Sequence, residues 1–279
     1  ITTEMAPTTR GVHLRFSYPT TGDAYLVLDG YTDMSEIKID PAKRQISGWV
    51  NNQRFVNDSK SFRNYFVVQF DKSFEDYGVW ENQKDEVFPQ KLDGSGKGYG
   101  AFIKFKKGSK VQAKAASSYI SAEQALITLN KELGKDKNLE VTKARGQKTW
   151  NEVLNRIVVE GCTDEQMKTF YSCLFRANLF SRKFYERKEN GEPYYYSPYN
   201  GKIYDGYMYT DNGFWDTFRS QFPLTNILHP TMQGRYMNAL LAAQEQCGWL
   251  PSWSSPGETG GMLGNHSISL LADAWAKGI

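Results

Sequence analysis

A change of hydrophobic period near residue 120 limits the fold of this 279-residue chain more than any other feature of its sequence. Before that point apolar and polar residues alternate, as in the run from Val12 to Tyr18, and Gly, Asn, Asp and Pro separate the runs. Alternation of this kind is typical of strands with one buried face, whereas the later apolar residues recur at helical spacing. The sequence therefore predicts an α+β, multidomain fold in which a β-sandwich precedes a set of helices.

The elements can be placed from these periods and from their end signals. Strands are expected over residues 12–18, 25–28, 46–50, 65–70, 101–105 and 111–119. A capping box, in which a Ser or Thr and a Gln three residues later satisfy free N–H groups, starts two helices, at Ser121 with Gln124 and at Thr163 with Gln166. Further helices are expected over residues 139–157, 213–227, 231–246 and 265–277, with irregular chain over 181–211.

These elements group into three expected parts. A β-sandwich domain covers residues 1–120, a helical linker covers 121–160, and a second, helical domain covers 161–279. The division follows from the change of hydrophobic period and from the two capping boxes. The one at Ser121 starts the linker, and the one at Thr163 lies at the start of the helical domain.

The balance of charges argues against a nucleic-acid partner. The 34 basic and 31 acidic residues leave a formal net charge of +3, which gives no strong field for nucleic acid or an anionic membrane. No apolar run reaches the length of a transmembrane helix. Three cysteines, Cys162, Cys173 and Cys247, lack the spacing of metal ligands and are expected to behave as small buried apolar side chains.

Aromatic residues make up 14% of the chain, and a group of tyrosines stands out. Its members are Tyr194, Tyr195, Tyr196, Tyr199, Tyr204, Tyr207 and Tyr209. Most aromatic side chains serve the core, but these lie among Gly, Pro and Asn, where loops are expected. Because amphipathic rings on loops often line a binding cleft, we expect part of a cleft here.

The pair Trp215 and Asp216 is the first candidate for ligand binding. At the start of an expected helix, the indole offers an apolar face to a sugar ring, and the carboxylate can accept two hydroxyl hydrogen bonds. An Asp in the first turn can equally complement the helix dipole, so the pair alone leaves a structural role open.

Glu258 and His266 are the second candidate. They flank a Gly-rich turn over residues 257–264. A carboxylate and an imidazole near a cleft can act as general acid and base. They can also be a loop anchor and the first residue of a helix, and the sequence favours these roles because no second catalytic carboxylate is indicated by a motif nearby.

Several stretches occur in the order and at the spacing of one enzyme group. The main ones are residues 209–219 (YTDNGFWDTFR), 248–253 (GWLPSW), 258–266 (ETGGMLGNH) and 272–279 (ADAWAKGI), with 46–49 (ISGW), 65–71 (YFVVQFD) and 117–125 (SSYISAEQA) upstream. In these stretches the chain resembles the glycoside hydrolase family 92 α-mannosidases, and the likeness covers essentially its whole length.

The resemblance implies a fold and a length. The helices from residue 161 onward would open an (α/α)6 barrel, and the sandwich would wall its active-site pocket. The chain would then be a fragment, because the family's proton donor, in a Glu-Gly-Asn segment, and its base, in an Asp-x-Asp segment, lie further toward the C-terminus. Since neither motif occurs before Ile279, we expect no catalytic residue here and an inactive isolated fragment.

The resemblance also implies substrate, cofactor and location. It points to exo-hydrolysis of terminal α-linked mannose with inversion, so the expected partners are mannose-containing glycans. Trp215, Asp216, Glu258 and His266 become the expected substrate-binding residues. The family depends on Ca²⁺, but no ligand pattern for the ion is evident here, so no metal ligand is assigned. A secreted, periplasmic or cell-surface protein is expected, although no signal peptide is recognisable.

Two other interpretations stay open on the sequence alone. One is another glycosidase built on a helical barrel, since Trp-Asp pairs occur in related barrels that act on glucose. The other is a carbohydrate-binding protein without catalysis, which would apply if 279 residues were the native length. Downstream Glu-Gly-Asn and Asp-x-Asp segments would favour the mannosidase. Linkage preference and oligomeric state cannot be predicted.

Overall fold

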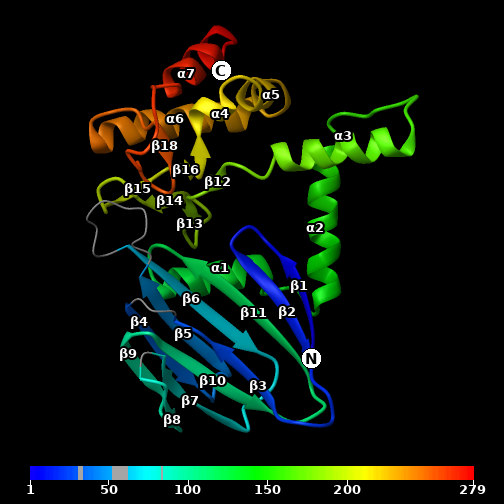
Figure 1. The fold of residues 1–279 in the computed structure, drawn as a ribbon, viewed down its shortest axis with the longest axis vertical. Helices are drawn as coiled ribbons and strands as arrows, with labels where there is room; N and C mark the ends of the chain where they lie inside the picture. The colour runs from blue at the N-terminus through cyan, green and yellow to red at the C-terminus, as the bar shows by residue number, and fades with distance from the viewer. Residues whose placement is uncertain (31–33, 52–61, 83) are drawn as a thin grey trace. The chain divides into compact units, whose positions relative to one another are not determined.

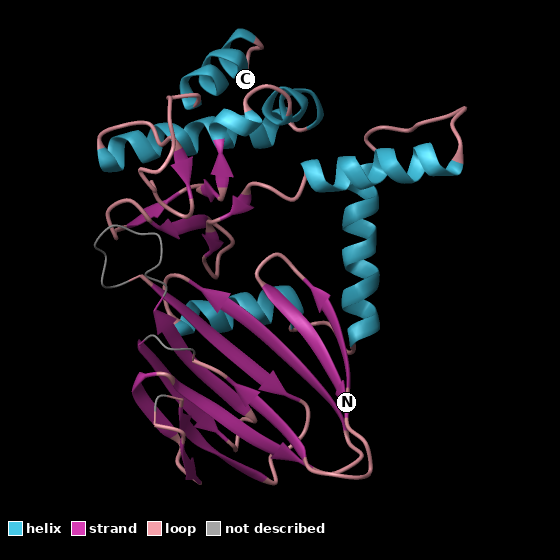
Figure 2. Ribbon diagram, viewed as in Figure 1, coloured by secondary structure: helices cyan, strands magenta, loops and turns pink. Residues whose placement is uncertain are grey.

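The computed structural model of the chain describes residues 1–30, 34–51, 62–82 and 84–279 (Figure 1). It divides into two compact units, the first ending at Gln147 and the second continuing from Lys148. The first unit holds nearly all the long strands and the second holds most of the helices (Figure 2). Strands followed by helices are therefore confirmed, whereas a closed barrel is not visible among the described residues. The predicted boundaries at residues 120 and 160 stay predictions.

Two antiparallel sheets form the first unit. The larger has the order β1-β2-β11-β6-β5-β4-β9 and the smaller the order β3-β10-β7-β8. The strands of the larger sheet are β1 (Thr2–Pro7), β2 (Gly11–Ser17), β4 (Met34–Asp40), β5 (Gln45–Asn51), β6 (Arg63–Phe70), β9 (Asp93–Lys97) and β11 (Lys110–Ser118). Those of the smaller sheet are β3 (Ala24–Leu28), β7 (Asp76–Glu81), β8 (Glu86–Pro89) and β10 (Tyr99–Phe105).

The core lies between these sheets. Alternate residues of each strand point inward, so Ile46 and Val68 of the larger sheet join Val79 and Ile103 of the smaller one in one cluster. The other face of the larger sheet carries helix α1 (Ala122–Leu133), whose Leu129 packs with Val67 of β6. Neighbouring Val67 and Val68 point to opposite faces of the larger sheet. Both are buried, because one face packs on the smaller sheet and the other face packs on α1.

A buried histidine ties β2 to the next helix, α2 (Leu139–Leu154). His13 is 1% exposed, and its Nδ1 lies 2.9 Å from Thr142 Oγ1. The Thr142 hydroxyl donates to Asp136 Oδ2 at 2.8 Å, so it must accept from an Nδ1–H of His13. The Nε2 atom is buried and has no hydrogen-bond partner among the described residues. The geometry therefore suits the neutral imidazole.

Short strands and further helices form the second unit. The helices are α3 (Asp164–Ala177), α4 (Phe214–Thr217), α5 (Gln221–Leu228), α6 (Pro230–Cys247) and α7 (Ser267–Ala276). The strands are β12 (Arg182–Lys183), β13 (Glu186–Arg187), β14 (Pro193–Tyr196), β15 (Ile203–Asp205), β16 (Tyr209–Thr210), β17 (Asn212–Gly213) and β18 (Trp253–Ser254). The stretch expected to be irregular thus contains small two- and three-stranded sheets.

The predicted single helix over 213–227 is wrong. It is broken after Thr217, and α5 restarts at Gln221. Pro223 explains the break, because its ring would clash with the carbonyl group of Arg219 in a continuous helix but is tolerated in a first turn. The capping box at Thr163 and Gln166 is confirmed. At Ser121 the side chain accepts from the Gln124 N–H as predicted, while the Gln124 amide donates to Thr128.

Helices α5 to α7 leave large apolar side chains uncovered. Ile227 is 72% exposed, Leu241 46%, Ile268 55% and Trp275 82%. These helices contact one another, so each still buries part of its surface. Among the described helices, none combines the length and the apolar character needed to cross a lipid bilayer.

His13 should make the stability of the first unit depend on pH. Burial, and to a lesser degree the charge of Lys114, lowers the pKa of His13 below its ordinary value. The unfolded chain then binds the proton more readily, so stability is full above about pH 6.5 and falls as the pH drops through that value. In urea unfolding between pH 7.5 and 5.5, His13→Gln should reduce this fall. An unchanged pH dependence in the variant would contradict the assignment.

Candidate carbohydrate site

A two-stranded ribbon joins the two candidate segments of the sequence. Strand β17 pairs with β18, with Asn212 opposite Ser254 and Gly213 opposite Trp253. Ser254 also forms an isolated bridge with Glu258. The segment that carries Trp215 and Asp216 is thereby brought beside the segment that carries Glu258, although the two are far apart in the chain.

Trp215 and Asp216 project from the one-turn helix α4. Asn212 braces this turn, because its amide donates to Ser181 Oγ at 2.9 Å and its carbonyl accepts from Thr217 Oγ1 at 2.8 Å. Trp215 is 43% exposed, and Asp216 is exposed as well. Among the residues that the structure describes, Asp216 forms no salt bridge, so its carboxylate is open to a ligand.

Gly213 lets an aromatic ring and this carboxylate come close together. A Cβ atom at Gly213 would lie 3.2 Å from two ring carbons of Trp253 and 3.3 Å from Asp216 Oδ2. The Trp253 ring and the carboxylate oxygen therefore approach each other closely over Gly213, where any side chain would be crowded. An apolar ring beside an acceptor of hydroxyl hydrogen bonds is an arrangement that suits a sugar.

Glu258 anchors its own loop. Its Oε2 atom accepts from the Ser252 N–H at 2.6 Å, and its Oε1 atom accepts from the Ser252 hydroxyl and the Gly260 N–H, both at 2.8 Å. These bonds tie Ser252 and Gly260 to Glu258 at the start of the Gly-rich turn. The arrangement matches the loop-anchor role that the sequence favoured, and it leaves free acceptor capacity on Oε2.

His266 lies at the N-cap position of α7, as a helix-terminal role requires. Its ring is 4.7 Å from the ring of Phe218, which follows α4 directly. It also lies close over Gly264. All four predicted residues are thus held near the β17–β18 ribbon by these contacts.

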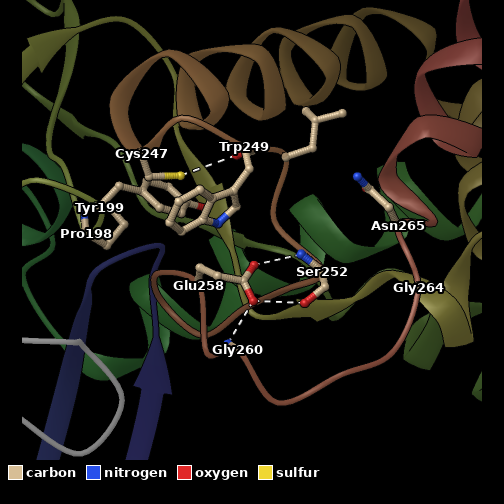
Figure 3. A pocket seen from close by; sticks show the side chains of 10 residues that line it. Pro198, Tyr199, Cys247, Trp249, Ser252, Glu258, Gly260, Gly264 and Asn265 are labelled. Carbon is tan, nitrogen blue, oxygen red and sulfur yellow. Dashed lines mark hydrogen bonds between the residues drawn. The ribbon is translucent and has the colours of Figure 1, made fainter.

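A cavity of about 660 Å³ opens beside Glu258 (Figure 3). Its lining residues are Pro198, Tyr199, Cys247, Trp249, Leu250, Ser252, Glu258, Gly260, Gly264 and Asn265. Of the four predicted residues, Glu258 lines this cavity and Trp215, Asp216 and His266 do not. Of the tyrosine group expected to line a cleft, Tyr199 does so, whereas Tyr195 and Tyr209 are buried among other side chains.

Sequence reasoning missed Trp253, Trp249 and Ser252. The GWLPSW stretch supported the family resemblance, but nothing in one sequence shows that Trp253 faces Gly213. Arg219, the last residue of the YTDNGFWDTFR stretch, lies over the Phe218 ring at 4.7 Å and forms no salt bridge among the described residues. The expectation of buried cysteines is wrong for Cys173, which is exposed, and Cys162 and Cys247 are only partly buried.

Within the described part of the chain, no group of three or more His, Cys, Asp and Glu side chains could hold a metal ion. The candidate residues therefore do not fit a calcium site of that kind, and no step of recognition is assigned to the ion here.

The model of the glycosyl hydrolase family 92 N-terminal domain matches residues 1–118, and that of the family's catalytic domain matches residues 124–279. No curated protein matches the chain.

The solved structures include mannosidases of Bacteroides thetaiotaomicron. The inverting mannosidase BT2199 of strain VPI-5482 is 42% identical with a TM-score of 0.94, and the match covers 99% of this chain and 37% of that one. The α-mannosidase BT3965 is 23% identical with a TM-score of 0.86, covering 99% and 38%, a likeness that shows the fold alone. The chain thus spans about 37% of the length of the first relative. The model of the family's catalytic domain alone matches more than half of the residues of this chain, so the chain belongs to glycosyl hydrolase family 92.

Proposed function

We propose that this protein takes part in the hydrolysis of terminal α-linked mannose from glycans, and that Asp216 binds hydroxyl groups of the terminal sugar. The observation that carries the proposal is the exposed Asp216 carboxylate, which borders the Trp253 ring across Gly213. Family membership supports glycoside hydrolysis, and the 42% identical relative, an inverting mannosidase, supports mannose as the sugar.

Recognition would use each side chain differently. The Asp216 carboxylate can accept two hydroxyl hydrogen bonds, which a charged acceptor strengthens. The exposed indole of Trp215 would cover an apolar face of the sugar. Glu258 and His266 are the other two residues that we propose for substrate binding. Glu258 would act by holding the loop that leads to His266.

The finer features of the reaction rest on the family resemblance. We include Ca²⁺ dependence, inversion and a secreted, periplasmic or cell-surface location in the proposal. Inversion needs two carboxyl groups about 6.5–9.5 Å apart, one to protonate the leaving oxygen and one to activate water. No such pair is assigned to the described residues, so their proposed part is to bind and orient the sugar.

The direct test is an assay of the intact gene product on matched aryl α-glycosides. Hydrolysis of the mannoside well above that of the glucoside, with the β-anomer seen first by NMR and activity lost with a calcium chelator, is the expected result. Equal hydrolysis of both substrates would contradict mannose specificity. Retention of the α-anomer would contradict inversion, and full activity after chelation would contradict the calcium proposal.

Asp216→Asn should weaken sugar recognition without harming the fold. The amide keeps one acceptor oxygen but loses the charge, and a charge-assisted hydrogen bond contributes roughly 1.5–3 kcal/mol. A fall of about ten- to a hundredfold in kcat/KM is expected, with the melting temperature nearly unchanged. A lower melting temperature with unchanged kcat/KM would instead assign Asp216 to helix capping.

Gly213→Ala should also weaken recognition, because the new methyl group would lie tightly against both Trp253 and Asp216. We expect roughly tenfold weaker binding of methyl α-mannoside by calorimetry, the loss of about one hydrogen bond's worth of free energy. Gly146→Ala is the matched control, since a Cβ there meets only the Pro7 carbonyl oxygen at 3.9 Å. Unaltered affinity in Gly213→Ala would show that sugar binding does not depend on how Trp253 and Asp216 are placed around Gly213.

A further inference from the structure

The cavity and the Asp216 carboxylate lie on opposite faces of the β17–β18 ribbon. Neighbouring side chains of a strand point to opposite faces, so Trp253 and Ser254 are on different sides of β18. Gly213 and Asp216 are on the Trp253 side. Tyr199 lines the cavity and its hydroxyl lies 3.0 Å from Ser254 Oγ, which places the cavity on the other side.

The walls of the cavity suit a polar ring, and its volume leaves ample room for one. Its volume of about 660 Å³ lies within the range of ordinary ligand pockets. Trp249, 60% exposed, offers an indole face at one side (Figure 3). Opposite it, Asn265 brings an amide from the start of α7, and its carbonyl oxygen already accepts from Ser267 Oγ at 2.5 Å. The amide N–H groups are then the donors it can offer to a ligand.

The charges at the cavity favour a neutral ligand. Neither Lys nor Arg is among its lining residues in the described chain, so an anion has no counter-charge there. The single lining carboxylate, Glu258, accepts three hydrogen bonds from Ser252 and Gly260. With one acceptor position left on Oε2, it can take a hydroxyl donor. An aromatic face with a few polar groups around it is the chemistry of a sugar-binding subsite.

We propose that this cavity binds one neutral hexopyranose unit of a glycan, stacked on Trp249, at a site separate from that of the terminal sugar at Asp216. The proposal rests on the proposed function, because it takes a glycan as the ligand. Trp249 and Asn265 would contact the sugar, and Glu258 would shape the wall of the cavity.

Cys247 provides a local measure of occupancy. Its thiol lies in the cavity wall and donates to the Trp249 carbonyl at 3.3 Å. Replacing Cys162 and Cys173 by Ser leaves Cys247 as the one thiol of this sequence. Burial raises the pKa of Cys247, so labelling by iodoacetamide is best followed at mildly alkaline pH. A sugar in the cavity should slow this labelling, whereas one held at Asp216 should not.

The test compares the labelling rate with α-mannobiose, methyl α-mannoside and sorbitol in this double-Ser background. Both cyclic sugars should slow labelling in a saturable way, and sorbitol should not. Trp249→Ala should raise the half-protecting concentration about two- to tenfold, which corresponds to the loss of one ring contact. Trp275→Ala, which removes another exposed indole, should leave protection unchanged. Cys247 should also remain protected by the sugars in Asp216→Asn.

Absence of protection by either sugar would overturn the proposal, as would equal protection by sorbitol. Protection that survives Trp249→Ala unchanged but disappears in Asp216→Asn would overturn it too, because the sugar would then act from the other face. These outcomes can be told apart from a failure of the proposed function. If the proposed function is wrong, the intact gene product does not hydrolyse the mannoside. Circular dichroism of each variant excludes loss of fold as the cause of a changed rate.

Discussion

The candidate site depends on the pairing of β17 with β18. Each strand has only two residues, so their own hydrogen bonds cannot hold them in place. Side-chain bonds around them do so: Thr210 Oγ1 donates to the Pro256 carbonyl at 2.6 Å, and the Tyr199 and Ser254 hydroxyls lie 3.0 Å apart. Thr210 and Ser254 are buried, where an unmade hydrogen bond would be costly. The ribbon is therefore held by polar contacts that water cannot readily replace.

The ribbon has two faces with different chemistry. On one face Gly213 lets the Trp253 ring approach the exposed Asp216 carboxylate, and the terminal sugar is proposed to bind at this carboxylate. On the other face Glu258 uses its charge to hold a turn, and the cavity beside it keeps an exposed indole. Two carboxylates that look alike in the sequence thus differ in what they can do, because one is free and the other is engaged.

Much of the fold could be predicted from the sequence. The sandwich followed from the alternation of apolar and polar residues in most strands. Val67 and Val68 depart from that alternation, because α1 covers the second face of their sheet and both residues are buried. The helix break at Pro223 was predictable in principle, but the apolar period across residues 213–227 hid it. The sequence singled out Trp215, Asp216, Glu258 and His266, whose role in sugar binding stays a prediction, and Trp253 was missed. Its role depends on a cross-strand partner forty positions away, and a single sequence holds no signal for such a pairing.

A crystal structure of the protein with methyl α-mannoside bound would show whether Asp216 holds the terminal sugar. The sugar is expected on the Gly213 face of the ribbon, with two of its hydroxyl groups within hydrogen-bond distance of the Asp216 carboxylate and its apolar side toward an indole. A mannoside bound without any contact to Asp216, or a ribbon in which Gly213 and Trp253 are not paired, would contradict it.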